Sequence, residues 1–150
     1  MPKLDLGAIE ERNVTDLPAP FAAVMAKRHI RQLGPQSGLT EFGISHVRIE
    51  PGGISSQRHW HDKEDEFVVM IEGEAVLVED EGETVMRAGD CAVFPKGVAN
   101  GHRLVNRSES DCVFLAVGSP EGGDCHYPDI DLHWDGTAAR YLHKDGAPWG

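Results

Sequence analysis

The sequence predicts an all-β fold of the barrel or sandwich kind. Turn signals rich in glycine, proline and acidic residues recur about every 8–12 residues between positions 43 and 117. The segments between them alternate apolar and polar residues; in residues 45–50, Val47 and Ile49 share one face. Because no long helical period separates these segments, we expect strand to follow strand through the middle of the chain.

Length and composition indicate one domain. The 150 residues, of which 40% are hydrophobic and 26% charged, suit a single folded unit with a real core. We expect this domain to span residues 1–150, with the barrel core at about residues 43–118. An arm, residues 1–42, precedes the core, and a tail, residues 119–150, follows it.

The core is predicted to hold a series of short strands. The strand at residues 45–50 leads through the turn Pro51-Gly52-Gly53 into a short strand that carries two histidines. The run Asp80-Glu81-Gly82 is typical of a hairpin turn. Further strands are expected at residues 66–72, 75–79, 83–87, 91–94, 101–106 and 111–117.

The arm and the tail carry weaker signals. Residues 21–27 predict a short helix, and residues 30–33 a strand that ends at Gly34-Pro35. In the tail we expect an extended segment over residues 127–132, with Ile130 and Leu132 turned inward, and a final strand over residues 139–143. The arm is expected to lie on the outside of the barrel or on a partner subunit.

Charge and cysteine content limit the partners and the compartment. A net charge of −11 argues against general nucleic-acid binding and against docking on an anionic membrane. No apolar run approaches a membrane span, and the N-terminus lacks the pattern of a signal peptide. The cysteines, Cys91, Cys112 and Cys125, are few and odd in number, which suggests reduced thiols. We therefore expect a cytoplasmic protein.

Residue types that bind metals gather at the centre of the chain. His59 and His61 are two residues apart, so an extended strand places both imidazoles on one face. Glu66 follows and opens an apolar run. Two imidazoles and a carboxylate are ligands for a divalent transition metal, and they suit zinc, iron, nickel and manganese alike. The alternative is a pair of surface histidines beside an acidic turn.

Glycines at fixed distances extend this group into a longer motif. Gly53 stands six residues before His59, and Gly73 seven after Glu66. The pattern resembles the first motif of the cupin superfamily: glycine, five residues, His-X-His, three or four residues, glutamate, six residues, glycine. The chain fits this motif at every fixed position, namely Gly53, His59, His61, Glu66 and Gly73.

The second cupin motif is matched in part. Residues 89–97 fit its first half, but Asn100 stands where a histidine is expected, and His102 comes two residues late. The spacing from His102 to Asn106 is then the expected one. We interpret this as a two-residue loop insertion that leaves Asn100 at the barrel mouth. In the alternative, Asn100 points at the metal, although an amide oxygen is a poorer partner than imidazole.

The resemblance implies a double-stranded β-helix, or jelly roll, that holds one divalent transition metal per chain. Its ligands would be His59, His61, Glu66 and His102. A small group of bacterial single-domain cupins is more similar still, because its members share the runs at residues 100–108 and 127–132. These members are often labelled as candidate sugar-phosphate isomerases.

Strand parity indicates a substrate pocket for a small molecule. Glu66 shares its face with Val68 and Met70, and His102 shares its face with Leu104. We expect these apolar residues to line the pocket, with Lys96 and Asn100 at its mouth. Among basic residues near the motifs, only Lys63 and Lys96 lie in loops that could reach this mouth. Glu66 is the candidate catalytic residue, because no other general base is evident.

The opposite face of the Glu66 strand suggests self-association. Phe67, Val69 and Ile71 are too apolar to face water, so the arm, the tail or a second subunit should cover them. We expect a homodimer.

Three functions fit these residues. The first is a metal-dependent isomerase or epimerase that acts on a sugar or a sugar-phosphate-like substrate. The second is a dioxygenase, in which a redox metal binds substrate and O₂. The third is a non-catalytic metal or ligand sensor. Met70 beside the metal would be prone to oxidation in an O₂ enzyme, which favours the first.

Overall fold

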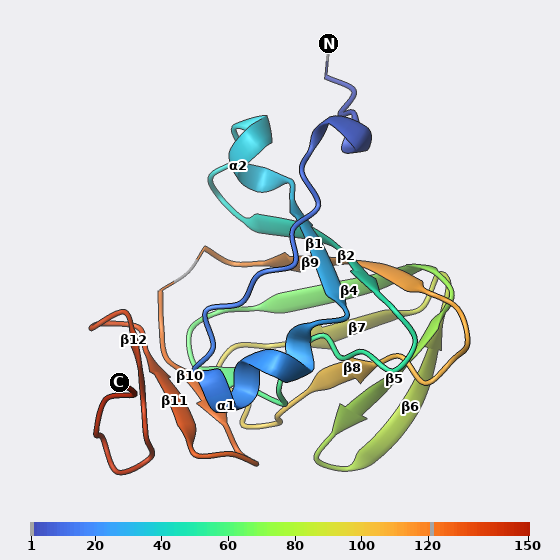
Figure 1. Cartoon of the computed structure of the whole chain (residues 1–150). Coiled ribbons are helices and arrows are strands. Elements are labelled where there is room, and N and C mark those ends of the chain that lie inside the picture. Colours follow the sequence, from blue (N-terminus) through green and yellow to red (C-terminus); the bar gives the residue numbers. More distant parts are fainter. Residues whose placement is uncertain (1, 121) are drawn as a thin grey trace.

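Antiparallel strands form almost all of the regular structure of the chain (Figure 1). The structure is a computed structural model, and it describes residues 2–120 and 122–150. The largest sheet has five strands in the order β1-β2-β9-β4-β7. A three-stranded sheet, in the order β6-β5-β8, packs against it. The strands of the five-stranded sheet are Arg28–Gln32 (β1), Gly43–Ile49 (β2), Cys112–Gly118 (β9), Glu66–Glu72 (β4) and Cys91–Phe94 (β7). Those of the smaller sheet are Gly82–Arg87 (β6), Glu74–Glu79 (β5) and Arg103–Val105 (β8).

The hydrophobic core lies between these two sheets. Ile49 and Met70 come from the large sheet and Leu77 from the small one, and all three are buried in a single cluster. The alternation of side chains along each strand explains this, since every second residue turns to the same face. The predicted all-β fold is confirmed: the chain is a jelly roll, or double-stranded β-helix.

Gly73 allows the chain to leave β4 and enter β5. Its φ is +71°, a left-handed conformation that side chains disfavour. A Cβ at this position would also lie only 2.6 Å from the carbonyl oxygen of Asp111. Both the conformation and the close approach require glycine, which accounts for the glycine that ends the first motif.

The arm contributes to the large sheet. A short helix, α1 (Ala19–Ala22), continues as the 3₁₀ helix η2 (Ala23–Met25). The observed helical segment therefore begins and ends about two residues before the predicted one, residues 21–27. Strand β1 pairs along its whole length with β2. Two further short elements are the 3₁₀ helix η1 (Leu6–Ala8) and the helix α2 (Gly34–Ser37). No helix in the described ranges is long and apolar enough to cross a membrane.

The tail folds into a small sheet of its own beside the barrel (Figure 1). Its strands are β10 (Cys125–Tyr127), β11 (Leu132–Asp135) and β12 (Arg140–Leu142), and β10 also pairs with the two-residue strand β3 (Trp60–His61). The prediction of one extended segment over residues 127–132 is wrong, because the chain makes a turn between β10 and β11. Pro128 and Asp129 are turn-forming residues, and Arg58 binds the Asp129 carboxylate at 2.7 Å and 2.8 Å. Leu132 is buried, as expected.

Candidate metal centre and substrate cavity

Backbone pairing brings the two motifs together. The amide of His59 donates to the carbonyl of His102 at 3.2 Å, and the amide of His102 donates back to the carbonyl of His59 at 2.9 Å. Residues that exchange both bonds in an antiparallel pair have their side chains on the same face. The two imidazoles therefore lie together, with ring centroids 4.9 Å apart.

Glu66, the first residue of β4, is the point on which the histidines converge. Its carboxylate lies 3.1 Å from Nε2 of His102 and 3.7 Å from Nε2 of His59, and it also contacts Nε2 of His61. The ligand atoms of His59, Glu66 and His102 all lie within 4.8 Å of one another. The structure thus gathers all four residues that the sequence suggested as metal ligands.

In His59 and His102, the nitrogen that points away from Glu66, Nδ1, lies close to a backbone carbonyl oxygen. Nδ1 of His59 lies 2.8 Å from the carbonyl of Gln57, and Nδ1 of His102 lies 3.3 Å from the carbonyl of Asn100. A carbonyl can only accept, so each Nδ1 carries a proton and each ring turns its Nε2 toward Glu66. If these Nε2 atoms release their protons to a bound cation, two imidazoles and a carboxylate face one another, and this donor set fits a divalent metal.

The charge on Glu66 is favoured by this arrangement. Burial would raise the pKa of Glu66, but hydrogen bonds from the surrounding imidazoles outweigh burial and hold the pKa well below its usual range. The carboxylate therefore remains ionised, as a metal ligand must be.

His61 has a different environment from the other two histidines. Its Nδ1 lies 2.7 Å from a carboxylate oxygen of Glu64, although the contact is out of line for a hydrogen bond. Burial lowers the pKa of His61, but Cys125, Glu64 and Glu66 raise it to about 12. The side chain of Glu64 is only 14% exposed, so this loop residue belongs to the surroundings of the site.

A cavity of about 210 Å³ opens beside Glu66 between the two sheets. Phe94 forms part of its wall and stacks on the His102 ring, with centroids 3.6 Å apart and planes at 6°. The stack fixes the plane of that imidazole. Of the expected pocket residues, Val68 and Leu104 line the cavity.

The other three expected pocket residues do not line this cavity. Met70 is packed in the core at 1% exposure. Lys96 is exposed in the loop after β7, where its backbone amide donates to Asp65. The Asn100 amide group donates to Glu79 at 3.0 Å and accepts from the backbone of Asp80 at 2.9 Å. Its side chain is thus engaged with the β5–β6 turn.

Arg28 is a cavity residue that the sequence did not suggest. It lines the cavity from β1, and its guanidinium donates to the carbonyls of Ser55 at 2.9 Å and Val14 at 3.2 Å. Burial lowers its pKa, and nearby acidic groups such as Asp16 only partly offset this. The motif residues gave no sign of it, because Arg28 lies far from them in the arm.

The fold and the histidine–glutamate group define a jelly-roll protein with a small internal cavity and a candidate metal centre. The cupin domain described as Cupin_2 matches residues 45–118. A sugar phosphate isomerase of the cupin superfamily from Silicibacter pomeroyi is 43% identical, with a TM-score of 0.93 over 99% of this chain and 97% of its own. The chain belongs to the cupin superfamily, whose domains commonly bind a metal.

More distant structures share the fold alone. A candidate sugar phosphate isomerase from Acidithiobacillus ferrooxidans is 22% identical, covers 94% of this chain and 90% of its own, and has a TM-score of 0.79. The polyketide cyclase RemF from Streptomyces resistomycificus is 21% identical over 79% of each chain, with a TM-score of 0.65. No curated protein matches the sequence.

Proposed function

We propose that this protein is a metal-dependent isomerase or epimerase acting on a small sugar or sugar-phosphate-like substrate. The observation that carries the proposal is the cavity of about 210 Å³ with His59, Glu66 and His102 in its wall. This volume lies below the range of about 300–1,000 Å³ typical of drug-sized ligands, so it suits a small substrate. The similarity to the Silicibacter pomeroyi sugar phosphate isomerase supports the same substrate class.

We propose that His59, His61, Glu66 and His102 hold one divalent transition metal: zinc, iron, nickel or manganese. Their imidazole and carboxylate donors suit each of these ions. A bound divalent metal supplies polarisation of a substrate carbonyl, which makes the neighbouring C–H more acidic.

Glu66 is the proposed proton carrier. Among the described residues that line the cavity, it is the one carboxylate. Because the substrate C–H would be more acidic in the metal-loaded site, a carboxylate within reach of that carbon can accept its proton even with a low pKa and return the proton to the adjacent carbon, as isomerisation requires. The apolar wall formed by Val68, Leu104 and Phe94 keeps water from competing for that proton.

Arg28 is the proposed partner of an anionic substrate group. A guanidinium carries five N–H donors, and the two carbonyl contacts at Ser55 and Val14 leave others free. Both of these contacts are to uncharged carbonyl groups, so the charge of Arg28 is available to a phosphate or carboxylate in the cavity.

A dioxygenase is the second candidate. His59, His102 and Glu66 form a group of two histidines and one carboxylate, and this donor set is typical of non-haem iron oxygenases. A non-catalytic sensor would use the same residues without turnover. We also propose a cytoplasmic location, which the free state of the three cysteines supports.

The test follows proton transfer directly. The metal-loaded protein is incubated in D₂O with a panel of aldose and ketose phosphates, and proton NMR follows loss of the C–H signal next to the carbonyl. We expect exchange with at least one substrate, its loss on chelation, and its loss in Glu66→Gln. Metal-replete protein that exchanges none of the panel would contradict the isomerase, and substrate-dependent O₂ consumption with iron would favour the dioxygenase.

A further inference from the structure

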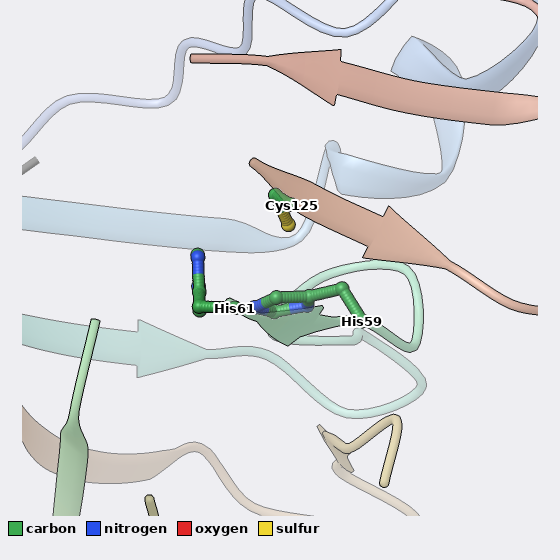
Figure 2. Close-up of side chains that lie close together, drawn as sticks. All are labelled: His59, His61 and Cys125. Atoms are coloured by element: carbon green, nitrogen blue, oxygen red, sulfur yellow. The ribbon is translucent and has the colours of Figure 1, made fainter. Parts of the chain in front are cut away.

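The tail brings a cysteine to the candidate metal centre. Strand β10 pairs with β3 so that Cys125 lies directly opposite His61. Opposed residues of an antiparallel pair turn to the same face of the sheet. Figure 2 shows the result: the sulfur of Cys125 is directed toward the imidazoles of His61 and His59.

These three side chains form a second group of possible ligand atoms. One atom each from His59, His61 and Cys125 lie within 4.8 Å of one another. The two imidazoles are nearly perpendicular, at 84°, with centroids 5.0 Å apart. Cys125 is a free cysteine and only 5% exposed, so its sulfur faces the histidines and not solvent.

We propose that Cys125 is a thiolate ligand of the metal centre. His59 belongs both to the group with Glu66 and His102 and to the group with Cys125, so a single ion held at His59 and His61 can be reached from both sides. On binding, the S–H bond breaks, a sulfur–metal bond forms, and the proton leaves to solvent. This inference rests on the proposed metal-dependent function and deepens it.

A thiolate changes which metal the site prefers. Sulfur is a soft donor and favours zinc, whereas carboxylate and imidazole alone serve manganese and iron as well. We therefore expect the wild type to bind zinc more tightly than manganese. In Cys125→Ser the difference between the zinc and manganese affinities should be smaller.

The chain supplies a matched control for the test. Cys91 is exposed on β7, outside both groups of ligand atoms. Cys112 is fully buried in the core, where burial raises its pKa to about 11, so it resists ionisation. Cys91→Ser therefore removes a thiol from the protein without touching the site.

Cobalt(II) reports on sulfur ligation without any activity measurement. The apo protein is titrated with cobalt while the near-ultraviolet thiolate-to-cobalt band and the weaker visible bands are recorded. We expect the sulfur band at one equivalent in the wild type and in Cys91→Ser. In Cys125→Ser the sulfur band should be lost while the visible bands remain.

A measurement on the wild type alone covers the case in which Cys125→Ser does not fold. X-ray absorption of the zinc-loaded protein should show one sulfur at about 2.3 Å. Zinc or cobalt bound at one equivalent without a sulfur neighbour would overturn the proposal and leave the four-ligand site intact. A sulfur band that persists in Cys125→Ser would overturn it too. Failure to bind any metal would instead reject the metal-dependent function itself.

Discussion

Trp60 stacks on His126, with ring centroids 4.1 Å apart and planes at 17°. The two residues are opposed in the β3–β10 pair and lie on the face away from His61 and Cys125. The stack therefore helps to hold β10 of the tail against β3, the strand that carries His61.

Loss of the Trp60–His126 stack should weaken metal binding. We expect Trp60→Leu to lower zinc affinity by about 10-fold, the lower end of the range for residues that support metal ligands. Competition with a chelator of known affinity measures it. Trp149→Leu is the control for tail packing in general, because Trp149 packs on Phe21 and His143 and against the cluster that holds Cys125, but its ring contacts with Phe21 and His143 do not involve β3. Equal losses in both variants would mean that the tail acts only through general stability.

The irregular second motif gives a prediction that separates its two interpretations. His102→Ala should lose metal affinity by more than about 100-fold, since even supporting residues contribute about 10–100-fold. Asn100→Ala should keep the metal, because its amide group binds Glu79 and Asp80. Isothermal titration with zinc measures both. A metal-replete His102→Ala beside a metal-poor Asn100→Ala would reverse the assignment.

Arg28 should matter for charged substrates only. We expect Arg28→Met to raise KM for a phosphorylated substrate by about 10–100-fold with kcat little changed, because one charge-assisted contact is lost in both ground and transition states. The same variant should treat an unphosphorylated sugar like the wild type. An equal effect on both substrates would show that Arg28 acts through its contacts with Ser55 and Val14, as a structural residue.

The outer surface of β4 and β7 should form a homodimer. Strand β7 lies at the edge of the large sheet, and Val93 in it is 66% exposed beside the exposed Phe67 and Ile71. An apolar edge strand is a template for pairing with another chain, and a second copy offers the matching edge. We expect sedimentation at micromolar concentration to give a dimer, and Val93→Lys to give the monomer. A wild-type species at 16.4 kDa would refute this prediction.

The sequence predicts the barrel well because local alternation and turns determine it. Strands β4 and β7 begin and end at the residues that the pattern indicated. Parity also places Val68 and Met70 on the interior face correctly. Parity does not tell where along the strand the cavity ends and the packed core begins, so it predicts Met70 in the pocket wall although Met70 is packed in the core.

Pairings between strands that lie far apart in the chain cannot be predicted from local sequence patterns. Nothing local to Cys125 shows that it will lie opposite His61, since only the register between β10 and β3 decides this. Arg28 reaches the cavity for a similar reason, because the pairing of β1 with β2 carries the arm into the sheet. Periodicity also gives no direction for Lys96 and Asn100, because hydrogen bonds set the conformation of the loop that carries them.

The pairing of β3 with β10 also concerns the order in which the protein is made. Ribosomes release the chain from its N-terminus, so the strand carrying His61 emerges long before its hydrogen-bonding neighbour in the tail. Until residues 125–127 are synthesised, His61 has no strand to hold it and Cys125 does not exist. The nascent barrel would therefore carry both motifs without this strand pairing, and the site would reach its final form only when the tail has emerged.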